Sequence, residues 1–187
     1  MTEQLSYNEL LASLTDEALA LTNPIIIIDG RAGSGKSTFA SKLQNQLFIE
    51  GDSAPRVLNM DDLYLGWDGL NDGVSYLQRM ILNPLLTKGS ASWQEYNWDT
   101  GQRDAWREFS GGTPLIIEGC GSLNTTTASL TNLTVWLDAP EQLRRDRWRE
   151  RDGEKFMQFF DMWAAQELDF IAREKSPELA NYYLLVQ

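Results

Sequence analysis

Apolar positions along the chain fall into short continuous runs that alternate with stretches of helical periodicity. The short runs are rich in Ile, Leu and Val, which is typical of strands buried on both faces of a parallel sheet. They lie at residues 25–28, 57–60, 115–117, 133–137 and 182–186. Apolar side chains recur at helical spacing at 3–20, 37–48, 73–86 and 140–174, the last stretch being interrupted near Gly153. Residues 93–100 are polar and aromatic, and we expect them to form a connector.

This alternation predicts an α/β fold in which a parallel sheet of about five strands is covered by helices on both faces. The length of 187 residues fits a single domain that spans residues 1–187. The composition, 42% hydrophobic and 23% charged, is ordinary for a globular protein. A disordered or collagen-like chain is therefore excluded.

Two residue types limit the chemistry that the chain can carry. Cys120 is the single cysteine, and histidine is absent. These counts exclude a disulfide framework, a Ser-His-Asp triad and a structural zinc site. The net charge of −11 disfavours nucleic-acid binding. No apolar run approaches the roughly 20 residues of a membrane span, and the N-terminus lacks a signal-peptide pattern. We expect a cytoplasmic monomer or homodimer without nucleic-acid or membrane partners.

The strongest motif follows the first apolar run, where residues 30–37 read GRAGSGKS. This G-x-x-x-x-G-K-S loop lies between a predicted strand and a predicted helix, as a phosphate-binding P-loop must. Its backbone N–H groups and the helix N-terminus attract phosphate. We expect Lys36 to reach the β and γ phosphates of ATP and the Ser37 hydroxyl to bind Mg²⁺. The predicted nucleotide-binding residues are Gly30, Arg31, Ala32, Gly33, Ser34, Gly35, Lys36, Ser37 and Thr38.

Carboxylates follow two of the other predicted strands. Asp61 and Asp62 come after the run at 57–60, at the strand edge where open α/β sheets bind ligands. One of them could accept the proton of an acceptor hydroxyl during phosphoryl transfer, and the other, more simply Asp62, could cap the next segment. Glu118 ends the run at 115–117. It could hold Mg²⁺ through water, as a Walker B acid does, or be a strand-end acid without a metal role.

Five arginines lie between residues 144 and 151 of an otherwise acidic chain. On a helix, Arg144, Arg147 and Arg151 share one face, while Arg145 and Arg149 share another. One face could close over the phosphates as a lid, at about residues 144–154, and neutralise charge during transfer. The alternative is a solvated helix carrying ion pairs. Arg147 and Arg151 are the predicted phosphate contacts.

Aromatic side chains form two further groups. The first falls in predicted loops, where it could wall a pocket or pack the loops down. It contains Trp67, Trp93, Tyr96 and Trp98. The second recurs near helical spacing and is most simply a core-facing stripe, with a dimer interface as the alternative. It contains Phe156, Phe159, Phe160, Trp163, Phe170 and Ile171.

Together these motifs resemble the uridine kinase-like P-loop kinases, a group that also includes phosphoribulokinase and bacterial pantothenate kinase. The stretch IIIIDGRAGSGKSTFASKL is similar to the opening of these enzymes, and the resemblance runs from residue 25 to about residue 152. The segment DDLY at 61–64 resembles their D-x-F-Y segment. This resemblance implies that Asp61 is the catalytic base and that Tyr64 lies at the acceptor site. Ile117-Glu118-Gly119 is similar to their V-E-G strand end, and the arginine run resembles their lid.

The segment from Tyr96 to Arg103 is similar to the family's Y-D-F-x-T-H-x-R segment, which implies that these two residues belong to the acceptor pocket. Gly101 stands where the family has His, and Asn97 replaces its acidic residue. The segment between Tyr64 and Tyr96 is also shorter than in a uridine kinase. Because these departures concern the acceptor pocket and not the ATP site, they indicate a divergent member.

The sequence therefore predicts the three-layer P-loop NTPase fold and a kinase activity. The γ-phosphoryl group of ATP would pass, with Mg²⁺, to a hydroxyl of a small molecule, with a nucleoside as the first candidate. One alternative is a kinase of the same fold for a nucleoside monophosphate, phosphosugar or pantothenate-like alcohol; Arg79 and Arg103 are the cations available for a monophosphate. The other is a nucleotide-binding ATPase or switch without an acceptor. The chain has no N-K-x-D motif, which argues against a GTPase.

Overall fold

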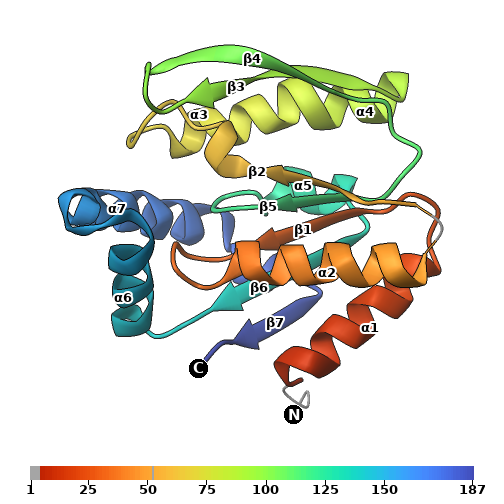
Figure 1. The fold of residues 1–187 in the computed structure, drawn as a ribbon, viewed down its shortest axis with the longest axis horizontal. Helices are drawn as coiled ribbons and strands as arrows, with labels where there is room; N and C mark the ends of the chain where they lie inside the picture. Colours follow the sequence, from red (N-terminus) through yellow and green to blue (C-terminus); the bar gives the residue numbers. More distant parts are fainter. Residues whose placement is uncertain (1–4, 52) are drawn as a thin grey trace.

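Five parallel strands lie at the centre of the computed structural model, which describes residues 5–51 and 53–187 (Figure 1). Their order across the sheet is β2–β5–β1–β6–β7. The strands are β1 (Ile25–Asp29), β2 (Arg56–Asn59), β5 (Leu115–Glu118), β6 (Leu133–Asp138) and β7 (Tyr182–Leu185). Every predicted apolar run thus forms a strand, and the parallel α/β class is confirmed.

The register of the central strands brings three strand ends together. β1 lies in the middle of the sheet, and all of its residues are buried. Ile28 of β1 is paired with Glu118 of β5, and Glu118 is paired on its other side with Asn59 of β2. The carboxyl ends of β1, β2 and β5 therefore meet at one edge of the sheet, where open α/β sheets bind ligands.

Helices cover both faces of the sheet and complete three layers (Figure 1). On one face, α1 (Tyr7–Leu19) and α2 (Lys36–Glu50) pack against Ile26 and Ile28. On the other face, α3 (Leu70–Tyr76), α5 (Thr125–Leu130), α7 (Met157–Glu174) and α8 (Ser176–Leu179) lie over Ile25 and Ile27. Successive residues of β1 thus serve opposite layers, because side chains alternate along a strand.

Helix boundaries follow local capping and breaking signals. The helix predicted at 3–20 begins at Tyr7, because Ser6 and Glu9 form a capping box in which each side chain accepts from the other's backbone N–H. Residues 3 and 4 lie outside the described residues. The helix predicted at 73–86 is longer: α3 continues through the π-helical segment η2 (Leu77–Leu82) into α4 (Asn83–Lys88).

The long C-terminal stretch is divided where predicted. α6 (Glu141–Asp152) is followed by Gly153, whose φ of +86° ends the helix, and the short 3-10 turn η3 (Glu154–Phe156) leads into α7. Within the residues that the structure describes, no helix combines the length and the apolar character needed to cross a membrane.

The expectation of a connector at 93–100 is wrong. These residues belong to an antiparallel hairpin of β3 (Ala91–Asn97) and β4 (Gln102–Phe109), which packs beside η2 and α4 at one end of the molecule (Figure 1). Ala91, Trp93 and Phe109 point into the core, while most other hairpin side chains are exposed or half-buried. A two-stranded hairpin buries only one face, so its strands carry charges and lack a continuous apolar run.

Candidate functional site

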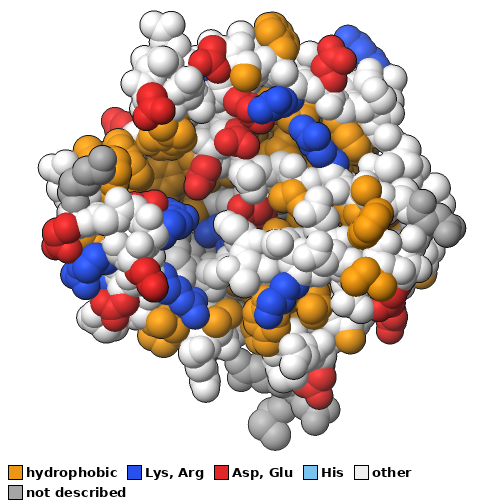
Figure 2. All heavy atoms as spheres, viewed as in Figure 1, with side chains coloured by type: hydrophobic (Ala, Val, Ile, Leu, Met, Phe, Trp, Pro, Cys, Tyr) orange, Lys and Arg blue, Asp and Glu red, His pale blue; other side chains and the backbone are white. Residues whose placement is uncertain are grey.

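A cleft of about 970 Å³ opens at the carboxyl edge of the sheet. It is bounded by the P-loop, the segment after β2, the turn of the hairpin and α6. Figure 2 shows a hollow with an apolar floor, acidic side chains on its upper side and basic side chains on its lower side. Seven residues singled out from separate motifs line this space: Lys36, Ser37, Asp61, Tyr64, Glu118, Arg147 and Arg151.

The P-loop connects β1 to α2, and close backbone packing requires two of its glycines. A Cβ at Gly30, which has a φ of +150°, would lie 2.0 Å from the carbonyl oxygen of Leu137. At Gly33, with a φ of +80°, a Cβ would lie 2.5 Å from the carbonyl oxygen of Arg144. Only glycine fits these positions without displacing backbone. Residues 32–38 line the cleft, whereas Gly30 and Arg31 line a small cavity behind the loop.

Lys36 is buried against the loop, with its ammonium group at one end of the cleft. Its Nζ donates to the carbonyl oxygen of Arg31 (3.1 Å) and to Cys120 Sγ (3.5 Å). Burial alone would lower the pKa of Lys36, but Cys120, Glu118 and Glu167 outweigh it and raise the pKa above its ordinary value. Lys36 is therefore a fixed positive charge.

Ser37 and Glu118, the two residues predicted to bind a metal, lie in contact. The Ser37 hydroxyl donates to Glu118 Oε1 at 2.8 Å. Burial raises the pKa of Glu118, and the charge of Lys36 and the Ser37 hydrogen bond oppose that effect. A hydroxyl oxygen beside a carboxylate supplies the kind of oxygen ligands that Mg²⁺ prefers.

Asp61 and Asp62 share the 3-10 turn η1 (Met60–Asp62) after β2, but they have different neighbours. Both line the cleft, and the charge of Asp61 contributes, after burial, to the raised pKa of Glu118. Asp62 is half-buried near the hairpin. Burial, Glu95 and Asp61 raise the pKa of Asp62 to about 6, with Arg107 acting in the opposite direction.

Arg147 and Arg151 line the cleft from α6. Arg147 Nη1 donates to the carbonyl oxygen of Gly33 in the P-loop at 3.2 Å. The Arg151 guanidinium is held by both carboxylate oxygens of Asp152, at 2.9 and 2.7 Å. Arg147 thus contacts the P-loop, whereas the contacts of Arg151 lie within α6.

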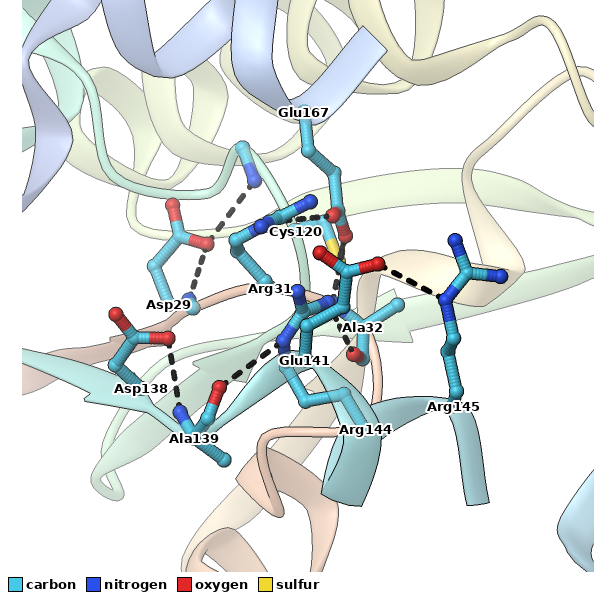
Figure 3. A network of polar contacts seen from close by, with 12 residues as sticks. Asp29, Arg31, Ala32, Cys120, Asp138, Ala139, Glu141, Arg144, Arg145 and Glu167 are labelled. Atoms are coloured by element: carbon cyan, nitrogen blue, oxygen red, sulfur yellow. Dashed lines mark hydrogen bonds and ion pairs between the residues drawn. The ribbon is translucent and has the colours of Figure 1, made fainter. Parts of the chain in front are cut away.

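The other three arginines of α6 have structural contacts. Arg144 is buried, and its Nε and Nη1 donate to the carbonyl oxygens of Ala139 (3.2 Å) and Ala32 (3.3 Å), which joins α6 to the P-loop (Figure 3). The remaining two form surface ion pairs, Arg145 with Glu141 and Asp161, and Arg149 with Asp146 and Glu154. The ion-paired alternative therefore describes these two residues.

Glu167 of α7 is a contact of the P-loop that sequence reasoning missed (Figure 3). Its Oε1 accepts from the backbone N–H of Ala32 (2.6 Å) and from the Cys120 thiol (3.2 Å), while Oε2 accepts from Arg31 Nε (3.2 Å). The sequence did contain a signal. Glu167 lies within the apolar stripe of α7, whose buried members are Phe160, Trp163 and Phe170. A carboxylate in a buried stripe requires polar partners.

Asp29, at the end of β1, is a second buried carboxylate that was missed. It accepts backbone N–H groups of Gly30 (2.6 Å), Gly121 (3.1 Å) and Leu123 (2.8 Å). Burial raises the pKa of Asp29 to about 7 against the effect of these donors and of Lys36. Asp29 therefore ties the start of the P-loop to the loop after β5.

The three acceptor-pocket candidates are placed differently. Tyr64 lines the cleft, is buried, and donates its hydroxyl to the carbonyl oxygen of Cys120 at 2.7 Å. Tyr96 and Arg103 lie outside the set of described residues that line the cleft. Tyr96 contacts Trp98 edge-on, with ring centroids 5.3 Å apart.

Arg103 instead fastens the hairpin to the segment after η1. Its Nη2 donates to the carbonyl oxygen of Leu63 (2.7 Å) and its Nη1 to that of Gln94 (3.2 Å). Its guanidinium lies 3.5 Å from the ring centroid of Tyr76. Burial lowers the pKa of Arg103 from its ordinary value.

Two of the loop aromatics line the cleft and also pack against their neighbours. Trp67 stacks on Phe159 of α7, with centroids 4.7 Å apart, and lies 4.9 Å from Trp98. Trp98 Nε1 donates to the carbonyl oxygen of Asp61 at 2.9 Å. Trp93 is buried in the hairpin core.

Comparison with solved structures finds the same fold in several proteins. One is described as a possible uridine kinase from Bacillus stearothermophilus, with 18% identity, a TM-score of 0.68, and coverage of 96% of this chain and 100% of that chain. Another is provisionally described as a fructose transport system kinase from Silicibacter sp. TM1040, with 18% identity, a TM-score of 0.66, and coverage of 95% and 98%. The YGR205w protein has 12% identity, a TM-score of 0.56, and coverage of 98% and 95%.

A comparison with curated proteins gives no match. A family model described as an AAA domain, in contrast, matches residues 26–159, which is most of the chain. That span contains the P-loop, both acidic strand ends and α6. P-loop domains bind nucleotides through the loop geometry described above. The chain therefore belongs to this AAA-domain family and has the P-loop NTPase fold.

Proposed function

We propose that the protein is a kinase that transfers the γ-phosphoryl group of ATP, with Mg²⁺, to a hydroxyl of a small molecule, with a nucleoside as the first candidate. The observation that carries this proposal is the convergence of Lys36, the Ser37–Glu118 pair and Asp61 on one cleft. Nucleotide binding accounts for Lys36 and Ser37. A further carboxylate beside them is what an alcohol acceptor requires, because its proton must be taken up.

In this proposal, the P-loop side of the cleft holds ATP. The loop N–H groups and the N-terminus of α2 bind the phosphates, and Lys36 exchanges its contact with the Arg31 carbonyl for phosphate oxygens. Ser37 and Glu118 would hold Mg²⁺, since their oxygens already lie 2.8 Å apart. Bound there, the ion neutralises phosphate charge that opposes transfer.

Asp61 is the proposed base. The charge of Asp61 contributes to the raised pKa of Glu118, whereas the pKa of Asp62 depends on Glu95 and Arg107 of the hairpin. Arg147 contacts the P-loop, and Arg151 lines the same cleft; both are proposed to stabilise the negative charge that develops on the transferring group.

We propose that the acceptor binds at the end of the cleft formed by η1 and the hairpin turn, which we call the acceptor end. Tyr64, Tyr96 and Arg103 are proposed to support this end. Tyr64 lines the cleft, and its ring packs against Trp163 with centroids 4.8 Å apart. Arg103 acts through the backbone that carries Asp61 and Asp62, because it binds the Leu63 carbonyl. It is a positioning residue in this proposal.

The proposal is tested by ADP release from purified protein with Mg-ATP and a panel of nucleosides, nucleoside monophosphates, sugars and pantothenate. One acceptor is expected to raise ADP release at least about tenfold. Lys36→Ala should abolish the stimulation, whereas Lys88→Ala, at an exposed position in α4, should not change it. Stimulation by a monophosphate alone would favour the alternative acceptor class. ATP binding without stimulation by any acceptor would favour the switch alternative.

A further inference from the structure

The charged side chains that line the cleft are distributed unevenly. Its cationic lining residues within the described ranges belong to the P-loop or to α6: Lys36, Arg147 and Arg151. Three carboxylates line the same part of the cleft, those of Glu118, Glu150 and Asp152. The charged lining residues of η1 and the hairpin turn are carboxylates: Asp61, Asp62 and Asp99. Within the same ranges, none of these three forms an ion pair. The acceptor end therefore presents three carboxylates without an ion pair, and the charges of Arg107 and Arg151 act on Asp62 and Asp61 from a longer distance.

The arginines near this end are already engaged or point elsewhere. Arg103 donates hydrogen bonds to the carbonyl oxygens of Leu63 and Gln94. Arg107 pairs with Glu95 at 2.8 Å. Arg79 is exposed on η2 and is not among the described residues that line the cleft. Arg151 lines the cleft and its charge acts on Asp61, but both oxygens of Asp152 hold its guanidinium. An acceptor with a phosphate or carboxylate would thus meet three carboxylates at this end, and the arginines around it already have partners or lie outside the lining.

Aromatic rings lie beside these carboxylates. Trp98 is 39% exposed, and its Nε1 is fixed to the carbonyl oxygen of Asp61. The ring of Trp67 lies next to that of Trp98, with their centroids 4.9 Å apart, and it stacks on Phe159. Aromatic faces pack well against flat rings, and they attract cations more strongly when carboxylates are close.

We infer that the acceptor is an alcohol with a flat ring and no anionic group, and that a positively charged ring is preferred to a neutral one. This inference rests on the proposed function. The acceptor hydroxyl oxygen bonds to the γ-phosphorus while the bond from that phosphorus to the bridging oxygen of ADP breaks, and the hydroxyl proton passes to Asp61. The ring lies against Trp98, with Asp62 and Asp99 compensating its charge.

Three ring alcohols of similar size and different charge test this inference. They are an N-methylated hydroxymethylpyridinium, the neutral hydroxymethylpyridine and hydroxymethylbenzoate. Their Kd values are measured by tryptophan fluorescence with Mg²⁺ and a non-hydrolysable ATP analogue bound, and their kcat/KM values by ADP release with ATP. The pyridinium is expected to bind at least about tenfold more tightly than the benzoate, with the neutral ring between them.

Variants of the carboxylates that line the cleft show whether these side chains determine the order of the three affinities. Asp62→Asn and Asp99→Asn should each reduce the cation-to-anion ratio of affinities about threefold or more. Asp169→Asn changes the net charge equally at an exposed position on α7 outside the cleft, and it should leave the ratio unchanged. Equal binding of benzoate and pyridinium, or identical ratios in all three variants, would overturn the inference. Charge-ordered binding without ADP release would support the selectivity of the site and contradict phosphoryl transfer.

Discussion

Asp61 and Asp62, which follow β2, have different neighbours, and we propose that only Asp61 acts as the base. Asp61→Asn should lower kcat by about a hundredfold or more, because the acceptor hydroxyl loses its base. The affinity for ATP should remain within about twofold, since Asp61 lies outside the phosphate-binding loop. Steady-state kinetics and nucleotide titration measure the two effects. A variant that keeps its kcat would show that Asp61 is not the base.

The raised pKa of Asp62 predicts how its charge affects stability. Burial, Glu95 and Asp61 raise the pKa from 3.8 to about 6 in the folded protein, and Arg107 opposes them. Between these pH values the folded chain holds a proton that the unfolded chain has released. The free energy of unfolding therefore falls as pH rises through this window, and above it the cost of the charge is fully present.

Asp62→Asn should accordingly raise the Tm at pH 7.5 by a few degrees, and this gain should shrink as the pH falls from 6 towards 4. Thermal unfolding of both proteins at a series of pH values measures the difference. Asp169→Asn, on the exposed face of α7, controls for the change in net charge. A gain that does not change with pH would contradict the assigned shift.

Glu167 is expected to matter for both stability and nucleotide binding. Glu167→Ala leaves the N–H of Ala32 without its partner, which should cost about 1–3 kcal/mol of unfolding free energy and weaken ATP binding. Glu167→Gln keeps an acceptor for that N–H and loses the ion pair with Arg31, so both losses should be smaller. Denaturant unfolding and nucleotide titration provide the comparison, and equal losses in the two variants would exclude the Ala32 contact as the cause.

At the scale of elements, α6 presents one face to the cleft and another to solvent. Arg147→Ala should lower kcat by about a hundredfold, the usual effect of removing one donor to developing charge, with little change in Tm. Arg149→Ala removes an equivalent side chain from the solvent face, where surface ion pairs contribute little, and should leave kcat unchanged. Similar kcat values for the two variants would contradict the assigned role of Arg147.

The central strands could be predicted from the sequence, whereas the β3–β4 hairpin could not. The central strands were predictable because strands buried on both faces, such as β1 and β5, must be continuously apolar. The hairpin was not, because exposed charged residues such as Asp104 and Glu108 hide the inward alternation of Ala91 and Trp93. The order of the strands also escaped prediction, since it depends on pairing between distant segments.

At the scale of the whole molecule, the cleft is assembled from segments far apart in the chain. The P-loop and the carboxylates that follow β2 and β5 were recognisable because each belongs to a local pattern of strand, turn and helix. Glu167 reaches Ala32 across 135 residues, and no local pattern records such a contact. The position of Arg103, which holds the hairpin beside η1, likewise depends on tertiary packing.

Transfer of labelled phosphate tests the central claim most directly. The protein is incubated with Mg-ATP labelled in the γ-phosphoryl group and with an acceptor that stimulates ADP release, and the label is followed by chromatography. We expect the label in a phosphate ester of the acceptor, formed in equal amount to ADP and absent with Lys36→Ala. Label recovered only as inorganic phosphate would contradict the account, because the cleft would then catalyse hydrolysis and not transfer.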